Sequence, residues 1–451
     1  MNRPPGESRK DCFVHILWGI GGMIVLLLIA VALSTSPRSI RPRTVLGALA
    51  IQVIFAFLVL RWEPGTRVLG VVADGVGRVI DSANEGIEFM VGPLLGQLEG
   101  NATVFAFQVL PIIVFIASLT AVLYHWNILQ WVVRLIGGGL QKVLGTTRAE
   151  SLNATANIFV GQTEAPLVVR PYLARMTRSE FFAVMAGGLS TVAGTVLVGY
   201  SLLGANLEYL IAASFMAAPA GLLMAKIIVP ETEKSTSDRA VLASTGGSAT
   251  SSAETPEEGS ADTDAPDEEE APATPESSEK PRNVIDAAAV GASDGMRLAL
   301  NVGAMLFAFI SLIALLNLIL GGVGGLFGLE DLTFQRVLGY VFSPVMVAIG
   351  VPLNEAVEAG SFLGQKLALN EFVAFADFGP AAEGLSDRTT VIVTFALTGF
   401  ANFGSLGILL GGLGGMVPSR RPLIAQFAIR AVLAGTLANL MSAAIAGILV
   451  P

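Results

Sequence analysis

Long apolar stretches recur along the chain and constrain its fold more than any other feature. A transmembrane helix needs about 20 mostly apolar residues, and only 14% of this chain is charged, against about 25% in soluble domains. The sequence therefore predicts an all-α integral membrane protein with about eight spans, and we expect it in the plasma (inner) membrane. The expected spans are Val14–Leu33, Val45–Leu60, Val104–Leu123, Phe181–Leu203, Tyr209–Val229, Met296–Leu320, Thr389–Val417 and Leu423–Val450.

The first apolar stretch has two interpretations. Arg3, Arg9 and Lys10 precede it, and the run Ala30–Ala32 resembles a cleavage site, as in a secretory signal peptide. The next apolar stretch follows after only a short loop, which favours a retained first span.

An acidic segment, residues 231–283, separates the fifth and sixth expected spans. It is rich in Ser, Thr, Ala, Pro, Glu and Asp, and its only large aliphatic residues are Val241 and Leu242. Such a composition buries too little apolar surface to offset the entropy of ordering, so we expect a disordered linker. The chain has no concentrated basic patch, which argues against a nucleic-acid polymer as partner.

A segment with helical periodicity follows the second expected span. Its apolar residues recur at the spacing of one helix face, with charged residues between them: Val68, Val72, Val76, Val79 and Ile80. This pattern is typical of an amphipathic helix that lies in the membrane interface. A surface helix packed on the rest of the protein fits the pattern equally well.

Two further apolar segments carry carboxylates. Leu152–Leu173 contains Glu164, and Val341–Phe378 contains Glu371. A carboxylate at mid-membrane costs about 2.5–3.5 kcal/mol on insertion scales, so it is tolerable only beside a polar cavity, a partner or a ligand. Bent backbone at that depth must also be covered by protein or water-filled space. We therefore interpret both segments as re-entrant hairpins.

Each expected hairpin precedes a span that is itself polar and rich in glycine. The fourth span contains Gly187–Thr195, and the seventh contains Gly399–Ser405. The order hairpin, broken helix, helix thus occurs twice, and alternation of the spans makes the two copies antiparallel. Inverted repeats whose broken helices meet around a substrate are typical of secondary transporters. Tight helix contacts are the alternative explanation for any one such glycine-rich stretch.

At these positions the sequence resembles the concentrative nucleoside transporters. Gly161–Leu167 (GQTEAPL) is similar to that family's first-hairpin signature, with matching flanks at Asn157–Val160 and Arg170–Leu173. Asn370–Phe375 (NEFVAF) resembles the second-hairpin signature, and Gly399–Ser405 (GFANFGS) resembles the unwound seventh helix. The likeness covers about residues 105–451, except for the acidic segment.

The resemblance implies a homotrimeric elevator-type transporter in membrane lipid. Each protomer would combine a scaffold with a transport domain that moves. The scaffold would comprise residues 1–128, with spans one to three and the interfacial helix, and residues 284–325, with span six. The transport domain would comprise residues 129–230 and 326–451, with the hairpins and the other spans, and residues 231–283 would be the linker.

The resemblance also assigns residues to the nucleobase. Gln162, Thr163 and Glu164 match family residues that hydrogen-bond the base directly or through water. Val196 matches an apolar contact to the base, and Phe400 matches an aromatic neighbour of the nucleoside. An amide, a hydroxyl and a carboxylate together can pair with the donors and acceptors on a base edge.

The ribose is assigned to the second half of the chain. Glu371, Asn402 and Ser405 match the family's ribose-hydroxyl binders, and a diol donates well to a carboxylate. The sequence departs from the common family pattern at Gly404, where many members have serine, and at Phe375, which is often tyrosine. Both departures bear on ribose contacts or selectivity.

The resemblance implies a coupling cation and no other cofactor. In sodium-coupled members the ion lies between the first hairpin tip and the broken fourth helix. The matching positions are Asn157, Val160, Thr191 and Val192, mostly through backbone carbonyls. Sodium is the favoured ion, and proton coupling through Glu164 or Glu371 is the alternative.

Other functions are less well supported by the sequence. The glycine-rich run Gly412–Gly415 is followed by no Walker lysine, so an ATP-driven pump is not expected. No Ser/His/Asp set is evident, and we expect no enzyme activity. A channel for small polar solutes and an intramembrane enzyme that uses Glu164 or Glu371 remain the competing hypotheses.

Overall fold

The structure is a computed structural model in which residues 9–95, 105–233, 281–326, 328 and 332–450 are described. Every regular element in these ranges is an α-helix or a short 3-10 helix, which confirms the all-α prediction. Six of the described helices are long and apolar enough to cross a membrane, and Ile16–Ala32 and Gly404–Met416 are shorter apolar helices. Most of the predicted acidic linker lies outside the described residues.

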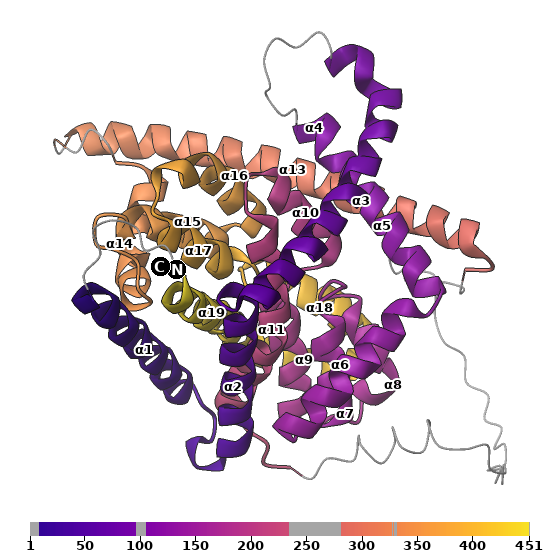
Figure 1. The fold of residues 1–451 in the computed structure, drawn as a ribbon, viewed down its shortest axis with the longest axis horizontal. Coiled ribbons are helices and arrows are strands. Elements are labelled where there is room, and N and C mark those ends of the chain that lie inside the picture. The colour runs from indigo at the N-terminus through magenta and orange to yellow at the C-terminus, as the bar shows by residue number, and fades with distance from the viewer. Residues whose placement is uncertain (1–8, 96–104, 234–280, 327, 329–331, 451) are drawn as a thin grey trace, which may run out of the picture.

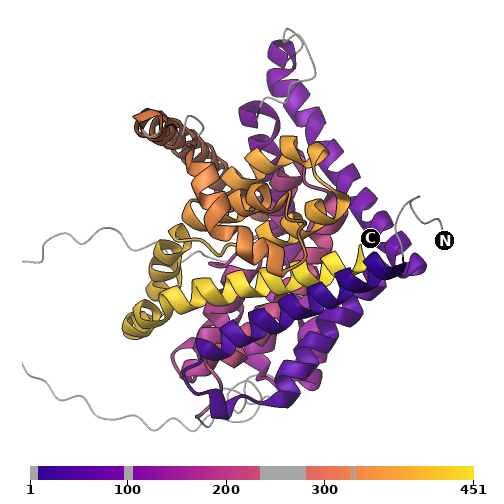
Figure 2. The same ribbon diagram turned by 90° about the vertical axis from the view of Figure 1, so that its left-hand side faces the viewer.

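The N-terminal part of the chain supplies four helices and two short connectors. These elements are α1 (Arg9–Ala32), η1 (Pro37–Ser39), α2 (Pro42–Leu60), α3 (Glu63–Leu95), α4 (Phe105–Gln108) and α5 (Leu110–His125). Helix α1 lies beside the C-terminal helix α19 (Arg421–Leu449), as Figure 2 shows. Helix α3 includes the predicted amphipathic segment and is longer at both ends. Its residues Ile80, Ala83 and Ile87 are buried against α5, while Val68 and Val71 are exposed.

The next group of helices contains the first expected hairpin and the broken fourth span. It comprises α6 (Ile128–Leu144), α7 (Arg148–Ala156), η2 (Ala165–Val169), α8 (Arg170–Leu173), α9 (Arg178–Ser190), α10 (Gly194–Leu202) and α11 (Leu207–Ile228). Capping boxes at Thr147 and Thr177 fix where α7 and α9 begin. The amphipathic helix α6, which is not among the expected spans, packs on α7.

The last group contains the second hairpin and the broken seventh span. It comprises α13 (Val284–Leu326), α14 (Phe334–Ala348), α15 (Ala356–Ala368), α16 (Glu371–Ala381), η3 (Ala382–Gly384), α17 (Asp387–Leu397), α18 (Gly404–Met416), η4 (Pro418–Arg420) and α19. The hairpin is formed by α15 and α16, so it begins later than Val341, where the sequence analysis started it. Residues 351–355 instead form the turn between α14 and α15, and Glu355 is the N-cap of α15.

The two groups repeat the same order of elements. A helix (α6 or α14), a hairpin, two half-helices and a long helix follow one another in each. In Figure 1 α6 to α9 lie at the lower right and α14 to α17 at the upper left, with the long helices α11 and α19 packed against each other between them. The two helix breaks meet in the interior, where the Phe400 amide donates to the Thr191 carbonyl at 3.2 Å. Helix α13 extends along the outside against α5 and, at 43 residues, exceeds the predicted sixth span at both ends.

Candidate functional site

A cavity of about 500 Å³ lies where the hairpin tips and the helix breaks meet. Every residue that the family resemblance assigned to the nucleoside lines this cavity. These residues are Gln162, Thr163, Glu164, Val196, Glu371, Phe400, Asn402 and Ser405. They come from the first hairpin tip, α10, α16 and the α17–α18 break, so only the tertiary fold brings them together. Their roles toward a nucleoside remain predictions.

The first hairpin supplies an amide, a hydroxyl and a carboxylate. The Glu164 amide donates to the Gly161 carbonyl at 3.0 Å and closes the turn at the tip. The Gln162 side chain is buried, and its Nε2 lies 3.5 Å from Ser405 Oγ, while its Oε1 has no hydrogen-bond partner in the described ranges of the chain. Glu164 is exposed within the cavity. An unpaired buried acceptor beside an exposed carboxylate is suited to a ligand that offers donors.

The second hairpin supplies a carboxylate that is more sheltered. Glu371 is only 5% exposed and is the first residue of α16, whose N-terminus is capped by Asn370. A helix N-terminus favours negative charge. Glu371 Oε2 accepts a hydrogen bond from Asn402 Nδ2 at 2.9 Å. The hydroxyl of Tyr200 also interacts with this carboxylate.

The break between α17 and α18 orients the polar groups beside Glu371. Asn402 Oδ1 accepts from the Ser405 amide at 2.8 Å, so its Nδ2 must face Glu371. Ser405 Oγ donates to the Phe400 carbonyl at 2.6 Å. Of the two departures from the family pattern, Gly404 lines the cavity, whereas Phe375 stacks on Tyr200 with ring centroids 4.5 Å apart and does not line it.

One wall of the cavity comes from α13, which the sequence analysis did not connect with the site. Leu298, Asn301 and Met305 lie on one face of that helix and line the cavity opposite the hairpins. The sequence signal was present, because Asn301 is a polar residue inside the most apolar helix. Its partner could not be identified without the fold.

The four positions predicted for a cation are all buried beside the first hairpin. Asn157, Val160, Thr191 and Val192 are each at most 7% exposed. Asn157 Nδ2 donates to the Asn153 carbonyl at 3.0 Å, and Asn157 Oδ1 has no partner within the described part of the chain. Buried side-chain oxygens without partners are suited to a hard cation. The residues therefore fit sodium, although Thr191 Oγ1 already donates to the Gly187 carbonyl at 2.9 Å.

Asn153 is a residue of this region that sequence reasoning missed. Its side-chain oxygen and nitrogen are buried and have no partner among the described residues. It stands one helical turn before Asn157, the C-cap of α7. Both amides lie next to Gly187 on α9. The spacing of the two asparagines was the available signal.

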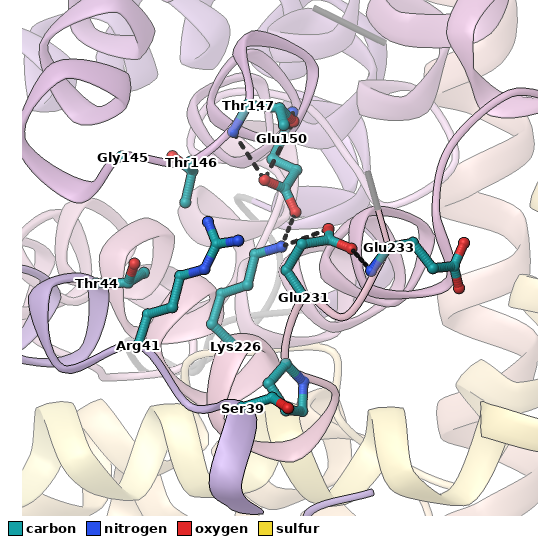
Figure 3. Close-up of a pocket in the computed structure, with 11 residues that line it drawn as sticks. Ser39, Arg41, Thr44, Gly145, Thr146, Thr147, Glu150, Lys226, Glu231 and Glu233 are labelled. Carbon is teal, nitrogen blue, oxygen red and sulfur yellow. Dashed lines mark hydrogen bonds and ion pairs between the residues drawn. The ribbon is translucent and has the colours of Figure 1, made fainter. Parts of the chain in front are cut away.

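A second polar hollow of about 460 Å³ lies away from the carboxylate cavity, at the start of α7 and the end of α11. Lys226 forms an ion pair there with Glu150 and lies 3.8 Å from Glu231, as Figure 3 shows. Arg41 points into the same space. Lys226 also donates to Ser179 Oγ at 2.9 Å. This network connects the beginnings of α7 and α9 with the end of α11.

Comparisons with known proteins agree with this arrangement. Family models described as the C-terminus and the N-terminus of Na⁺ dependent nucleoside transporters match residues 209–447 and 21–94. A model described as nucleoside recognition, Gate, matches residues 106–207. The chain is 51% identical over 437 residues to the uncharacterized transporter YutK of Bacillus subtilis, a match covering 97% of this chain and 100% of that one.

A relative that is named for its substrate class and a solved structure match the chain over a similar extent. The nucleoside permease NupC of Helicobacter pylori is 44% identical, over 96% of this chain and 98% of that one. The structure of CNTnw in an inward-facing substrate-bound state matches with a TM-score of 0.84 and 49% identity, over 96% of this chain and 98% of that one. These matches confirm the resemblance inferred from the hairpin motifs. The chain is therefore an integral membrane protein that belongs to the family of Na⁺ dependent nucleoside transporters.

Proposed function

We propose that this protein is a secondary active transporter that imports nucleosides across the plasma membrane by symport with sodium. The observation that carries the proposal is the shared cavity, into which Glu164 and Glu371 extend from two hairpins far apart in sequence. Carboxylates and amides at the meeting point of broken helices offer a polar site within an otherwise apolar protein. Membership of the Na⁺ dependent nucleoside transporter family supports both the substrate class and the ion.

In this proposal the cavity binds the two ends of a nucleoside separately. Gln162, Thr163 and Glu164 pair with the base edge, and Val196 and Phe400 contact its faces. The ribose hydroxyls donate to Glu371, beside Asn402 and Ser405. The support is chemical: Asn402 turns its amide NH₂ to one Glu371 oxygen, which leaves the carboxylate's other lone pairs for the sugar.

Sodium binds in this proposal between the first hairpin tip and the start of the α9–α10 break. Asn157, Val160, Thr191 and Val192 provide oxygens, and the unpartnered Asn157 Oδ1 supports the assignment. The Gly194 amide donates to the Phe159 carbonyl at 3.1 Å and holds the tip against the break. A cation bound there would tighten the same contact, which would couple ion binding to the shape of the neighbouring cavity.

The proposed transport cycle is an elevator movement within a homotrimer. The scaffold is residues 1–128 and 284–325, and the transport domain is residues 129–230 and 326–451, with about eight spans, two re-entrant hairpins and the interfacial helix α3. The wide apolar exposure of α13, which includes Phe307 and Leu318, supports a surface covered by lipid or by neighbouring protomers.

Uptake by proteoliposomes tests the proposal. Purified protein should accumulate radiolabelled uridine or adenosine above equilibrium when a sodium gradient is imposed, and it should show counterflow. Replacement of external sodium by choline at fixed pH should abolish accumulation. Undiminished uptake in choline that responds to a proton gradient would identify proton coupling instead. Equilibration without accumulation would identify a channel, and chemical conversion of the solute, seen by mass spectrometry, an enzyme.

A further inference from the structure

The two repeats fasten their hairpins to their helix breaks in the same way. In the first repeat the Gly194 amide donates to the Phe159 carbonyl at 3.1 Å. In the second repeat the Phe403 amide donates to the Leu367 carbonyl, also at 3.1 Å. Phe159 and Leu367 therefore occupy equivalent positions, and the residues around them can be compared directly.

Beside Phe159 the first repeat presents oxygens without a cation. The side-chain oxygens of Asn153 and Asn157 are buried, and neither has a hydrogen-bond partner among the residues that the structure describes. The region also lies at the carboxyl end of α9, where the last carbonyls of a helix carry partial negative charge. These features make it the position proposed above for the mobile coupling ion.

Beside Leu367 the second repeat presents a cation of its own. Lys366 is completely buried, and its Nζ donates to the Ala396 carbonyl at 2.7 Å, in the last turn of α17. The same Nζ donates to Asn439 Oδ1 at 2.9 Å. The ammonium thus lies at the carboxyl end of a half-helix, which is where the first repeat has its unpartnered oxygens.

Asn439 makes this arrangement specific. Its Nδ2 donates to the Ser190 carbonyl and to the Thr398 carbonyl, each at 2.7 Å. With both donors used on the ends of the two broken helices, its Oδ1 must face Lys366. The charge of Lys366 also interacts with that of Glu371. Lys366 Nζ therefore joins the end of α17 to Asn439, beside the ribose-side carboxylate.

We propose that Lys366 is a covalently attached cation that occupies, in the second repeat, the position that the mobile coupling cation occupies in the first. This inference rests on the cation site of the proposed function. Its consequence is that the second repeat is held in its binding geometry permanently, whereas the first repeat acquires that geometry only when an ion binds. Each chain then has one position for a mobile cation, because the other is filled by its own side chain.

Replacement of Lys366 by a shorter oxygen-bearing side chain tests the proposal. Lys366→Asn removes the ammonium group and leaves a space lined by the Ala396 carbonyl and Asn439 Oδ1. This space should form a second sodium site. The full-length variant is purified in detergent, and its melting temperature is measured against sodium, with choline chloride holding ionic strength constant. We expect a second saturable stabilisation by sodium, and a Hill coefficient for sodium in uridine uptake that rises from about one to about two.

Lys366→Met is the matched control, because it removes the charge but fills the volume and adds no oxygen. It should have a lower melting temperature than wild type at every sodium concentration and only the wild-type sodium response. The proposal is overturned if Lys366→Asn shows the same single sodium response as wild type, or if it fails to fold at every sodium concentration. If the melting temperature of wild type does not change with sodium, the proposed sodium coupling is contradicted. That outcome is distinguishable from failure of the Lys366 proposal, in which wild type responds to sodium and Lys366→Asn shows the same single response.

Discussion

Substitution of Glu371 by glutamine is the most direct test of how the cavity holds a sugar. Asn402 Nδ2 donates to Glu371 Oε2 at 2.9 Å, and Asn402 cannot turn over because its Oδ1 accepts from the Ser405 amide at 2.8 Å. A glutamine at position 371 must therefore turn its carbonyl toward Asn402. Its NH₂ then faces the ribose, so an acceptor for a sugar hydroxyl is replaced by a donor.

The size of the effect follows from this forced orientation. A hydrogen bond to a charged group contributes about 1.5–3 kcal/mol, which corresponds to about 10- to 150-fold in Kd. We expect Glu371→Gln to weaken uridine binding by that factor while the Asn402 contact is kept. Asn354→Ala is the control, because Asn354 is an exposed residue of the α14–α15 turn and should leave binding unchanged.

Calorimetric titration with deoxynucleosides makes the test specific for the sugar. 2′-Deoxyuridine and 3′-deoxyuridine are titrated into wild type and Glu371→Gln. One of the two deoxynucleosides lacks the hydroxyl that contacts Glu371. Its Kd for wild type should be as high as the Kd of uridine for Glu371→Gln. Its Kd for Glu371→Gln should be no higher than its Kd for wild type. Equal losses for uridine and both deoxynucleosides, or equal effects of Glu371→Gln and Asn354→Ala, would refute the assignment.

Three further substitutions test other parts of the structure. Asn301→Leu removes the polar group that α13 contributes to the cavity. It should raise the KM for uridine about 5-fold, which corresponds to a loss of about 1 kcal/mol, without changing the sodium dependence of uptake. An unchanged KM would show that Asn301 does not contribute to nucleoside binding. Thr191→Val should raise the sodium concentration for half-maximal uptake about 10-fold, whereas Thr195→Val, on the nucleoside cavity, should not; equal effects would contradict the cation position. Lys226→Met leaves Glu150 buried without its cation and should destabilise the protein by about 3–5 kcal/mol, seen as a lower melting temperature. The double variant with Glu150→Gln should recover most of the lost stability. No recovery would show that the loss of the ion pair is not the cause.

Local patterns were sufficient where the physical constraint is itself local. Apolar length fixed where the helices of the membrane region lie, and the structure contains a helix over each expected span. Glu164 and Glu371 could be identified as site candidates because a carboxylate in an apolar segment requires a polar environment. That both carboxylates belong to one shared cavity could be inferred only from the repeated order of hairpin and broken helix, which is typical of inverted repeats that meet around a substrate.

Element boundaries and two whole helices were not predictable in the same way. Helices α6 and α14 mix polar and apolar residues, so neither resembles a span, and each is stabilised by packing against the hairpin helix that follows it. The second hairpin was started too early because the turn at residues 351–355 is apolar on both sides. Such segments acquire their structure from neighbours that lie elsewhere in the chain.

The sequence by itself determined that the protein is helical, that it resides in a membrane and that two carboxylates are placed where apolar surroundings make them costly. Only the tertiary structure decided which groups accompany them, including the wall formed by Asn301 and the contact of Lys366 with Asn439, 73 residues away in the chain. The physical reason is that hydrophobicity and helix periodicity are properties of neighbouring residues. The pairing of buried polar groups depends instead on which helix ends meet in space.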